Sequence, residues 1–270
     1  QEILGLHVNE GEKSVVIHAY LPRAEKVWVK ATGRNGRVPM TRLHRAGFFQ
    51  ARVAGEEKAF PYKIGFRDET GYERETEDPY AFKPQISDED LHLYAEGRHF
   101  RAYEKFGARP MTVEGVSGVH FAVWAPNAKA VSVVGNFNHW YPGHHPMIRV
   151  HFSGIWALFV PGLKEGEVYK YAIKTAGGHV IQKADPYAFR AELRPHTASM
   201  VADLGKFRWS DKKWMESRAK WNYLERPISI YEAHLGSWKR DQKKHWGYLS
   251  YRDLAHGIAE HVKAMGFTHV

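Results

Sequence analysis

A tryptophan in a short polar stretch offers the clearest chemistry in this sequence. Trp140 closes the segment Asn136-Phe137-Asn138-His139, whose residue types are typical of a turn between strands. An indole ring held in such a turn can stack on a glucose ring, one face of which is largely C–H. Two plainer interpretations stay open. Trp140 could instead pack at the edge of a sheet, and Asn136 and Asn138 could simply hold the turn by local hydrogen bonds.

Residues for several other kinds of chemistry are missing or poorly spaced. The chain has no cysteine, which excludes disulfides, thiol nucleophiles and thiolate metal sites. The pair His144-His145 has no third ligand at a useful spacing, so we expect no metal and no other cofactor. A chain without cysteine also suits a reducing compartment, and we expect a cytoplasmic protein.

Hydropathy and charge argue against membrane and nucleic-acid partners. The longest apolar run, residues 155–160, ends at Pro161 and is far too short to span a bilayer. The net charge of +9 would fit a nucleic-acid binder, but lysine and arginine are scattered and form only short doublets. We therefore expect no membrane partner and no nucleic acid, and keep a basic nucleic-acid binder only as an alternative.

The chain contains an internal repeat. Residues 78–82 (Asp-Pro-Tyr-Ala-Phe) recur as residues 185–189, 107 positions later, whereas an upstream Leu-Pro and its matching Ala-Pro are 104 positions apart. The second copy has therefore gained three residues between these anchors, which we place near residues 136–140. Because Asp78 and Asp185 occupy matching places in the two copies, we predict a shared turn-forming role for them rather than chemistry.

Both copies have the pattern of short antiparallel strands. Val119, Phe121 and Val123 alternate with other residues, which puts one set of side chains on a core face and the other on the outer face. Turn residues separate such runs at short intervals. The fold class we predict is mainly β, with two tandem immunoglobulin-like antiparallel β-sandwiches at residues 1–105 and 106–205.

Capping signals mark the connecting segments. Ser87 followed by Asp90 three residues later predicts a connector helix near residues 88–96, at the end of the first sandwich. Residues 206–227 are polar with interspersed aromatic rings, and we interpret them as a linker.

The segment 228–270 has a different pattern. A strand-like run starts at Ile228, Ser250 and Asp253 form a capping pattern, and apolar residues then follow at helical spacing until Gly266. A new strand-like run comes next, so the order is strand, helix, strand of the parallel kind. Because a parallel sheet needs more strands than these, we predict the start of an unfinished domain.

Four segments resemble one enzyme family. Residues 121–128 (FAVWAPNA) resemble the start of the starch-binding-type β-sandwich that precedes α-amylase-superfamily barrels, and residues 134–140 (VGNFNHW) are similar to its glucan-facing turn. Residues 228–238 (ISIYEAHLGSW) resemble the first barrel strand of bacterial 1,4-α-glucan branching enzymes, and residues 263–269 (KAMGFTH) the entry to their second strand. By these motifs the chain resembles the N-terminal portion of this family.

The resemblance implies a fold and a reaction. The segment 228–270 would be the first β-α-β piece of a (β/α)8 barrel. In the family's retaining double displacement, one carboxylate attacks the anomeric carbon of an α-1,4-linked glucan while a carboxylic acid protonates the leaving oxygen. A 6-hydroxyl of another chain then captures the glycosyl-enzyme, which makes an α-1,6 branch in glycogen biosynthesis. The family's nucleophile and acid/base fall beyond Val270, so we expect no catalytic residue here and no branching by these 270 residues alone.

The resemblance also assigns a carbohydrate site and α-glucan as its partner. The implied binding residues are Trp140, Asn138, Asn136 and Lys170, with Lys170 contacting sugar hydroxyls. The family's second aromatic is missing at residues 176–179, so we expect a weak site, and residues 31–36 of the first copy have no aromatic, which favours a spacer or positioning domain. The alternative is a free-standing glucan-binding or regulatory protein, which would have no reason to end in the start of a parallel unit.

Overall fold

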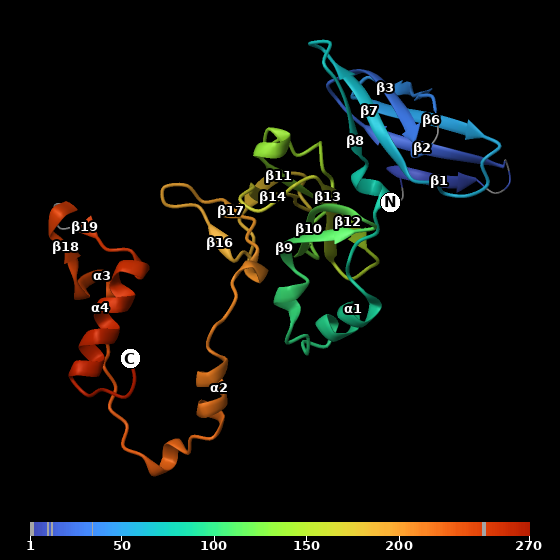
Figure 1. Ribbon diagram of the computed structural model, residues 1–270. Helices are drawn as coiled ribbons and strands as arrows, with labels where there is room; N and C mark the ends of the chain where they lie inside the picture. Colours follow the sequence, from blue (N-terminus) through green and yellow to red (C-terminus); the bar gives the residue numbers. More distant parts are fainter. Residues whose placement is uncertain (1–2, 10, 12, 34, 245–246) are drawn as a thin grey trace. The chain divides into compact units, whose positions relative to one another are not determined.

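The computed structural model describes residues 3–9, 11, 13–33, 35–244 and 247–270 (Figure 1). The chain divides into two units, Gln1–Lys206 and Phe207–Val270. The first unit holds two pairs of antiparallel sheets, and the second is mainly helical. The prediction of a mainly β fold built from antiparallel sandwiches is confirmed.

The first pair of sheets packs around one apolar core. One sheet has the order β1 (Gly5–Asn9), β2 (Ser14–Tyr20), β6 (Phe48–Ala54) and β5 (Thr41–His44). The other has the order β4 (Val38–Pro39), β3 (Ala24–Ala31), β7 (Tyr62–Asp68) and β8 (Glu73–Glu77). Alternate residues of both sheets point inward, so that Ile17 and Phe49 from one meet Val29 and Ile64 from the other in the core. We call this pair of sheets the first sandwich.

The second sandwich follows the same plan. One sheet has the order β12 (Ile148–Val150), β13 (Ile155–Pro161), β10 (Val116–Trp124) and β9 (Gly107–Val113). The other is built on β11 (Ala130–Gly135) and β14 (Val168–Lys174), with β15 (Val180–Lys183), β16 (Arg190–Ala191) and β17 (Ser199–Met200) beyond β14. Phe121 and Leu158 meet Val133, Tyr169 and Tyr171 in its core.

The strand orders confirm that the two sandwiches are copies of one topology. The order β5-β6-β2-β1 in the first matches β12-β13-β10-β9 in the second. The Met40 amide donates to the Val27 carbonyl, and the Met147 amide donates to the Val131 carbonyl, both at 2.8 Å. Between these equivalent bonds the second copy is three residues longer, in the interval that contains residues 136–140.

The duplicated Asp-Pro-Tyr-Ala-Phe motif builds the same lock in both copies. Asp78 accepts a hydrogen bond from the Tyr80 amide at 3.0 Å and one from the Tyr62 hydroxyl at 2.5 Å. Asp185 accepts from the Tyr187 amide at 2.8 Å and from the Tyr169 hydroxyl at 2.6 Å. Both aspartates are buried, and burial raises the pKa of each, that of Asp78 to about 6, against the lowering effect of these hydrogen bonds. The predicted turn-forming role is correct, and each aspartate also ties the turn to the core.

Short helices connect the two sandwiches. Helix α1 spans Asp88–Ala95, where the capping pattern predicts it, and Ser87 and Asp90 form the reciprocal capping bonds. Among the described residues, 3-10 turns η2 (Pro79–Ala81) and η3 (Ala102–Glu104) precede and follow α1, whereas η4 (Asn136–Asn138) and η5 (Leu204–Lys206) come after β11 and β17.

The second unit contains the predicted C-terminal helix. Its elements are α2 (Lys212–Ala219), η6 (Tyr223–Glu225), α3 (Leu235–Trp238), β18 (Arg240–Asp241), η7 (Gln242–Lys244), β19 (Gly247–Tyr248) and α4 (Tyr251–Ala264). Helix α4 has the predicted Ser250–Asp253 capping box, and Gly266 follows it with a φ of 75°. At 14 residues it is the longest helix in the described part of the chain, where no helix is both long and apolar enough to cross a membrane.

The strand predicted from Ile228 is shorter than expected. Pairing there is limited to one parallel bridge, between Ile230 and His269, which the backbones of Ser229 and Tyr231 make, and α3 begins at Leu235 instead of more strand. The parallel pairing and the order of the segments are as predicted from the sequence. The strand is short because a strand forms only where neighbouring strands pair with it, and the two segments here are both short. The (β/α)8 barrel remains a prediction.

Candidate functional site

The turn after β11 holds two consecutive residues in a left-handed conformation. Strand β11 ends at Gly135, where a Cβ atom would lie 2.2 Å from the Val168 carbonyl oxygen, so only glycine fits. Turn η4 follows, and then His139 and Trp140 have φ values of 54° and 59°. For a bulky residue such as Trp140 this conformation costs about 1–3 kcal/mol, and it persists only where the surroundings hold it. Backbone strain of this kind is concentrated at functional sites.

Asn138 holds the turn from inside. Its side chain is 2% exposed. Its Oδ1 accepts from the Gly135 amide, and its Nδ2 donates to the Val133 carbonyl and lies at hydrogen-bond distance from His145 Nδ1, all at 2.9 Å. The amide group is therefore fully used within the protein. The structure places Asn138 as a support of the turn and not as a side chain that faces a ligand, in contrast to the carbohydrate-binding role expected from the resemblance.

His145 completes this support as a neutral ring. Burial, and to a smaller extent the nearby charges of His144 and Arg74, lower the pKa of His145 to about 4. At neutral pH the ring is therefore uncharged, and its unprotonated Nδ1 can accept the Asn138 amide. The histidine pair that we excluded as a metal site thus includes a hydrogen-bond acceptor for the turn.

Trp140 is half-buried and its indole edge is anchored. The Trp140 backbone amide donates to the Gly135 carbonyl at 2.9 Å. The indole Nε1 donates to Oδ1 of the exposed Asn136, also at 2.9 Å. One atom of the ring plane is thus fixed by a side chain that itself faces solvent. The arrangement preorients a flat ring at the surface, which suits stacking on a sugar.

Lys170 lies on the same end of the outer sheet face as this turn. In the register of β11 and β14, Lys170 is paired with Val134, two residues before Asn136. Its Nζ donates to the Thr197 hydroxyl at 2.8 Å, which holds the ammonium group over the sheet. The register thus places Lys170 beside the strand end from which the turn starts, and we use the name Trp140 face for Trp140, Asn136 and Lys170 together.

Two other stretches singled out in the sequence have no aromatic ring to add. Residues 176–179 form the tight β14–β15 hairpin turn, closed by a 2.8 Å bond from the Thr175 amide to the His179 carbonyl. Residues 31–36 of the first sandwich follow β3, and Arg34 within them lies outside the described residues.

The loop that follows Trp140 was not predicted from the sequence. Residues 141–146 return to β11, where the Val133 amide donates to the His145 carbonyl at 3.1 Å and Pro146 forms a bridge with Ser132. Tyr141 in this loop is 43% exposed. A glycine in this loop was the signal that the sequence offered. In the structure Gly143 lies close to the Tyr141 ring, where a Cβ would be 2.5 Å from a ring carbon.

Two family models match separate parts of the chain. Residues 1–80 match the model described as the N-terminal domain of the alpha-1,4-glucan branching enzyme GlgB. Residues 105–188 match Carbohydrate-binding module 48, also described as the isoamylase N-terminal domain. The second match contains the whole turn and strand β14, and therefore Trp140, Asn136 and Lys170.

Curated relatives match along the whole chain. The 1,4-alpha-glucan branching enzyme GlgB of Thermosynechococcus vestitus is 45% identical over 100% of this chain and 38% of its own length. The enzymes of the same name from Gloeobacter violaceus and Cellvibrio japonicus are 46% and 44% identical, over 99% and 100% of this chain and 36% and 37% of their own lengths. The chain thus spans a little over a third of the relatives it matches. In sequence, its 270 residues correspond to the N-terminal portion of the GlgB branching enzymes.

Proposed function

We propose that this chain is the glucan-binding front of a 1,4-α-glucan branching enzyme, and that its second sandwich binds α-glucan through the Trp140 face. The observation that carries the proposal is the strained turn that presents the indole of Trp140. A left-handed conformation is uncommon for a bulky residue such as tryptophan, and a preoriented ring is what a sugar platform needs.

The chemistry of the face suits a neutral sugar chain. Stacking on Trp140 would bury the C–H face of one glucose residue. The exposed amide of Asn136 and the ammonium group of Lys170 can hydrogen-bond to hydroxyls at the edge of the ring. With a single stacking ring on this face we expect weak binding to glycogen or amylose-like chains.

The reaction that we propose for the complete enzyme is cleavage of an α-1,4 bond and transfer to a 6-hydroxyl by a retaining double displacement. Such a mechanism needs two carboxyl groups about 5 Å apart. Their expected place, after the strands of a barrel, stays a prediction, as does a cytoplasmic location. The Trp140 face would hold a glucan chain near the enzyme and raise its local concentration.

Replacement of the indole tests the binding site directly. In calorimetric titrations with maltoheptaose we expect Trp140→Ala to weaken binding at least about tenfold, which corresponds to about 1.4 kcal/mol. Trp209→Ala is the matched control, because Trp209 is 77% exposed and lies in the other unit. Equal affinity of Trp140→Ala and the unmodified chain, or an equal loss with Trp209→Ala, would show that glucan binds elsewhere or not at all.

A further inference from the structure

The first sandwich contacts the loop that carries the Trp140 turn. Tyr80, in the duplicated motif, donates its hydroxyl hydrogen to the Pro146 carbonyl at 2.9 Å. The Tyr80 ring also packs against the core of the second sandwich. This tyrosine therefore links the end of β8 to the segment that returns from Trp140 to the sheet.

One more side chain of the first sandwich meets the same loop, and the charges of two others act on it. The Tyr20 hydroxyl faces Tyr141. Burial, and to a smaller extent this neighbour, raise the pKa of Tyr20. Burial is the main reason that the pKa of His144 is lowered, and the charge of Arg23 adds to this effect. The charge of Arg74 likewise adds to the lowering of the pKa of His145. Tyr20 on β2 thus contacts the loop 141–146, and Arg23 in the β2–β3 turn and Arg74 on β8 lie near enough for their charges to act on its histidines.

The loop passes these contacts on to the turn. The Tyr141 amide donates to the Asn138 carbonyl at 3.1 Å, and Asn138 Nδ2 reaches His145 Nδ1 at 2.9 Å. Pro146, which receives the Tyr80 hydroxyl, is bridged to Ser132 on β11. A shift of the loop would therefore move both the backbone and the buried amide that hold Trp140 in place.

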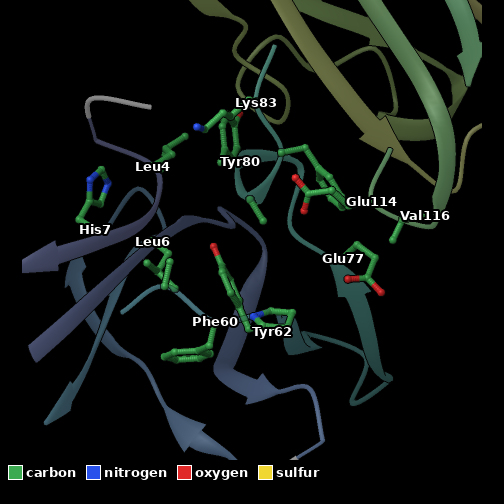
Figure 2. A pocket seen from close by; sticks show the side chains of 14 residues that line it. Leu4, Leu6, His7, Phe60, Tyr62, Glu77, Tyr80, Lys83, Glu114 and Val116 are labelled. Atoms are coloured by element: carbon green, nitrogen blue, oxygen red, sulfur yellow. The ribbon is translucent and has the colours of Figure 1, made fainter. Parts of the chain in front are cut away.

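An open space beside Tyr80 makes the Tyr80–Pro146 hydrogen bond more important for the alignment of the two sandwiches. A cavity of about 630 Å³ lies there, lined by Leu6 and Tyr62 of the first sandwich and by Glu114 and Val116 of the second (Figure 2). Because the two sandwiches do not pack tightly at the cavity, their alignment depends more on the direct links at its edge. The Tyr80 hydroxyl provides one of these links.

We propose that Tyr80 is a positioning residue, through which the first sandwich braces residues 141–146 and so holds the Trp140 face in its binding conformation. The proposal rests on the proposed function, since it names what prepares that same site. It also assigns a task to the first sandwich, whose equivalent face has no aromatic turn of its own.

The repeat supplies a matched control for this role. Tyr187 is the equivalent of Tyr80 in the second copy, and it makes the same backbone bond to its aspartate. Its ring stacks on Phe106 with centroids 5.2 Å apart, and its hydroxyl lies against Tyr94 instead of the loop. Tyr187→Phe therefore removes the same group from the same motif without touching residues 141–146.

The test uses the full 270-residue chain labelled with nitrogen-15. The indole N–H signal of Trp140 is identified by its loss in Trp140→Phe, and each variant is titrated with maltoheptaose. We expect Tyr80→Phe to shift this signal in the absence of sugar and to weaken maltoheptaose binding about two- to fivefold. Tyr187→Phe should leave both the signal and the affinity unchanged.

The outcomes separate this inference from the proposed function. If the unmodified chain does not respond to maltoheptaose, the proposed function fails, while the sugar-free shift in Tyr80→Phe still decides whether the brace exists. If the chain binds but Tyr80→Phe changes neither signal nor affinity, or if Tyr187→Phe changes both equally, the brace is refuted. Should Tyr80→Phe not fold, Tyr20→Phe decides: a shifted Trp140 signal supports the brace, and an unshifted one refutes it.

Discussion

The two sandwiches have one strand order, yet they use the equivalent outer face in different ways. In the first, Trp28 on β3 is paired with Gly65 on β7, and the indole lies flat on the glycine. At the equivalent pair of the second, Ser132 on β11 faces Ala172 on β14. The pair in the first copy buries a large ring that the second copy does not have.

A layer of charges then covers the ring of the first copy. The Arg37 guanidinium lies 4.3 Å from the Trp28 ring centroid, and Arg37 pairs with Glu73 and Glu75 on β8. Trp28 is 6% exposed and donates its indole hydrogen to Glu75 at 3.3 Å. The first sandwich therefore seals its tryptophan within the sheet face, whereas the second carries one on a strained turn at the end of the face. A repeat can therefore keep its core and its aspartate lock while only one copy carries a tryptophan on a left-handed turn at the end of the sheet face.

The largest effect should come from crowding the Trp28–Gly65 pair. In Gly65→Ala the new Cβ would lie 2.0 Å from the indole nitrogen, and we expect the first sandwich to lose about 3 kcal/mol of unfolding free energy. Ala172→Gly, the reverse change at the equivalent position, should cost only about 1 kcal/mol in the second sandwich. Hydrogen exchange read by mass spectrometry on peptides of each sandwich measures both, because the sandwiches need not unfold together.

A double-mutant cycle checks the cause of that loss. In a Trp28→Ser background, which copies the second sandwich, Gly65→Ala should cost close to nothing. If Gly65→Ala lowers the unfolding free energy as much without the indole as with it, a clash with Trp28 is not the reason that position 65 needs glycine.

A smaller difference should separate the two aspartate locks. Asp78 receives one tyrosine hydroxyl, whereas Asp185 receives Tyr169 at 2.6 Å and Tyr171 at 3.2 Å. Tyr62→Phe removes the hydroxyl that donates to the buried Asp78, and we expect the first sandwich to lose about 2 kcal/mol of unfolding free energy. Tyr169→Phe should cost about 1 kcal/mol, since Tyr171 still donates. Equal costs in the same exchange experiment would show that the second tyrosine adds nothing.

Local patterns were enough to predict the repeated sandwiches. Alternation such as that of Val119, Phe121 and Val123 reflects the burial of one sheet face, which depends on neighbours along the strand. The three-residue gain before Met147 was readable because the anchors on either side of it are repeated. The Ser87 and Ser250 caps were predictable for the same reason, since each capping box spans four residues.

The parts that escaped prediction depend on distant partners. The burial of Asn138 follows from the return of His145 to β11, which no local pattern announces. Tyr80 and Pro146 are 66 positions apart, and their contact depends on how the sandwiches dock. The left-handed Trp140 was unexpected because glycine or asparagine is the usual residue there. The run from Ile228 was overestimated as a strand because pairing, not composition, decides its length.

The smallest effect should come from uncovering Trp28. Arg37→Ala removes the guanidinium from the ring, and we expect a loss of less than about 1 kcal/mol from the cation–π contact. Quenching of tryptophan fluorescence by acrylamide should increase, because one face of the indole gains access to solvent. Affinity for maltoheptaose should not change, since Trp28 lies within the sheet with its other face on Gly65. The sharpest version uses a Trp140→Ala background: a gain of glucan binding on adding Arg37→Ala would mean that the first copy conceals a sugar platform. In that case the charged layer, and not the missing aromatic turn, would be what distinguishes the two sandwiches.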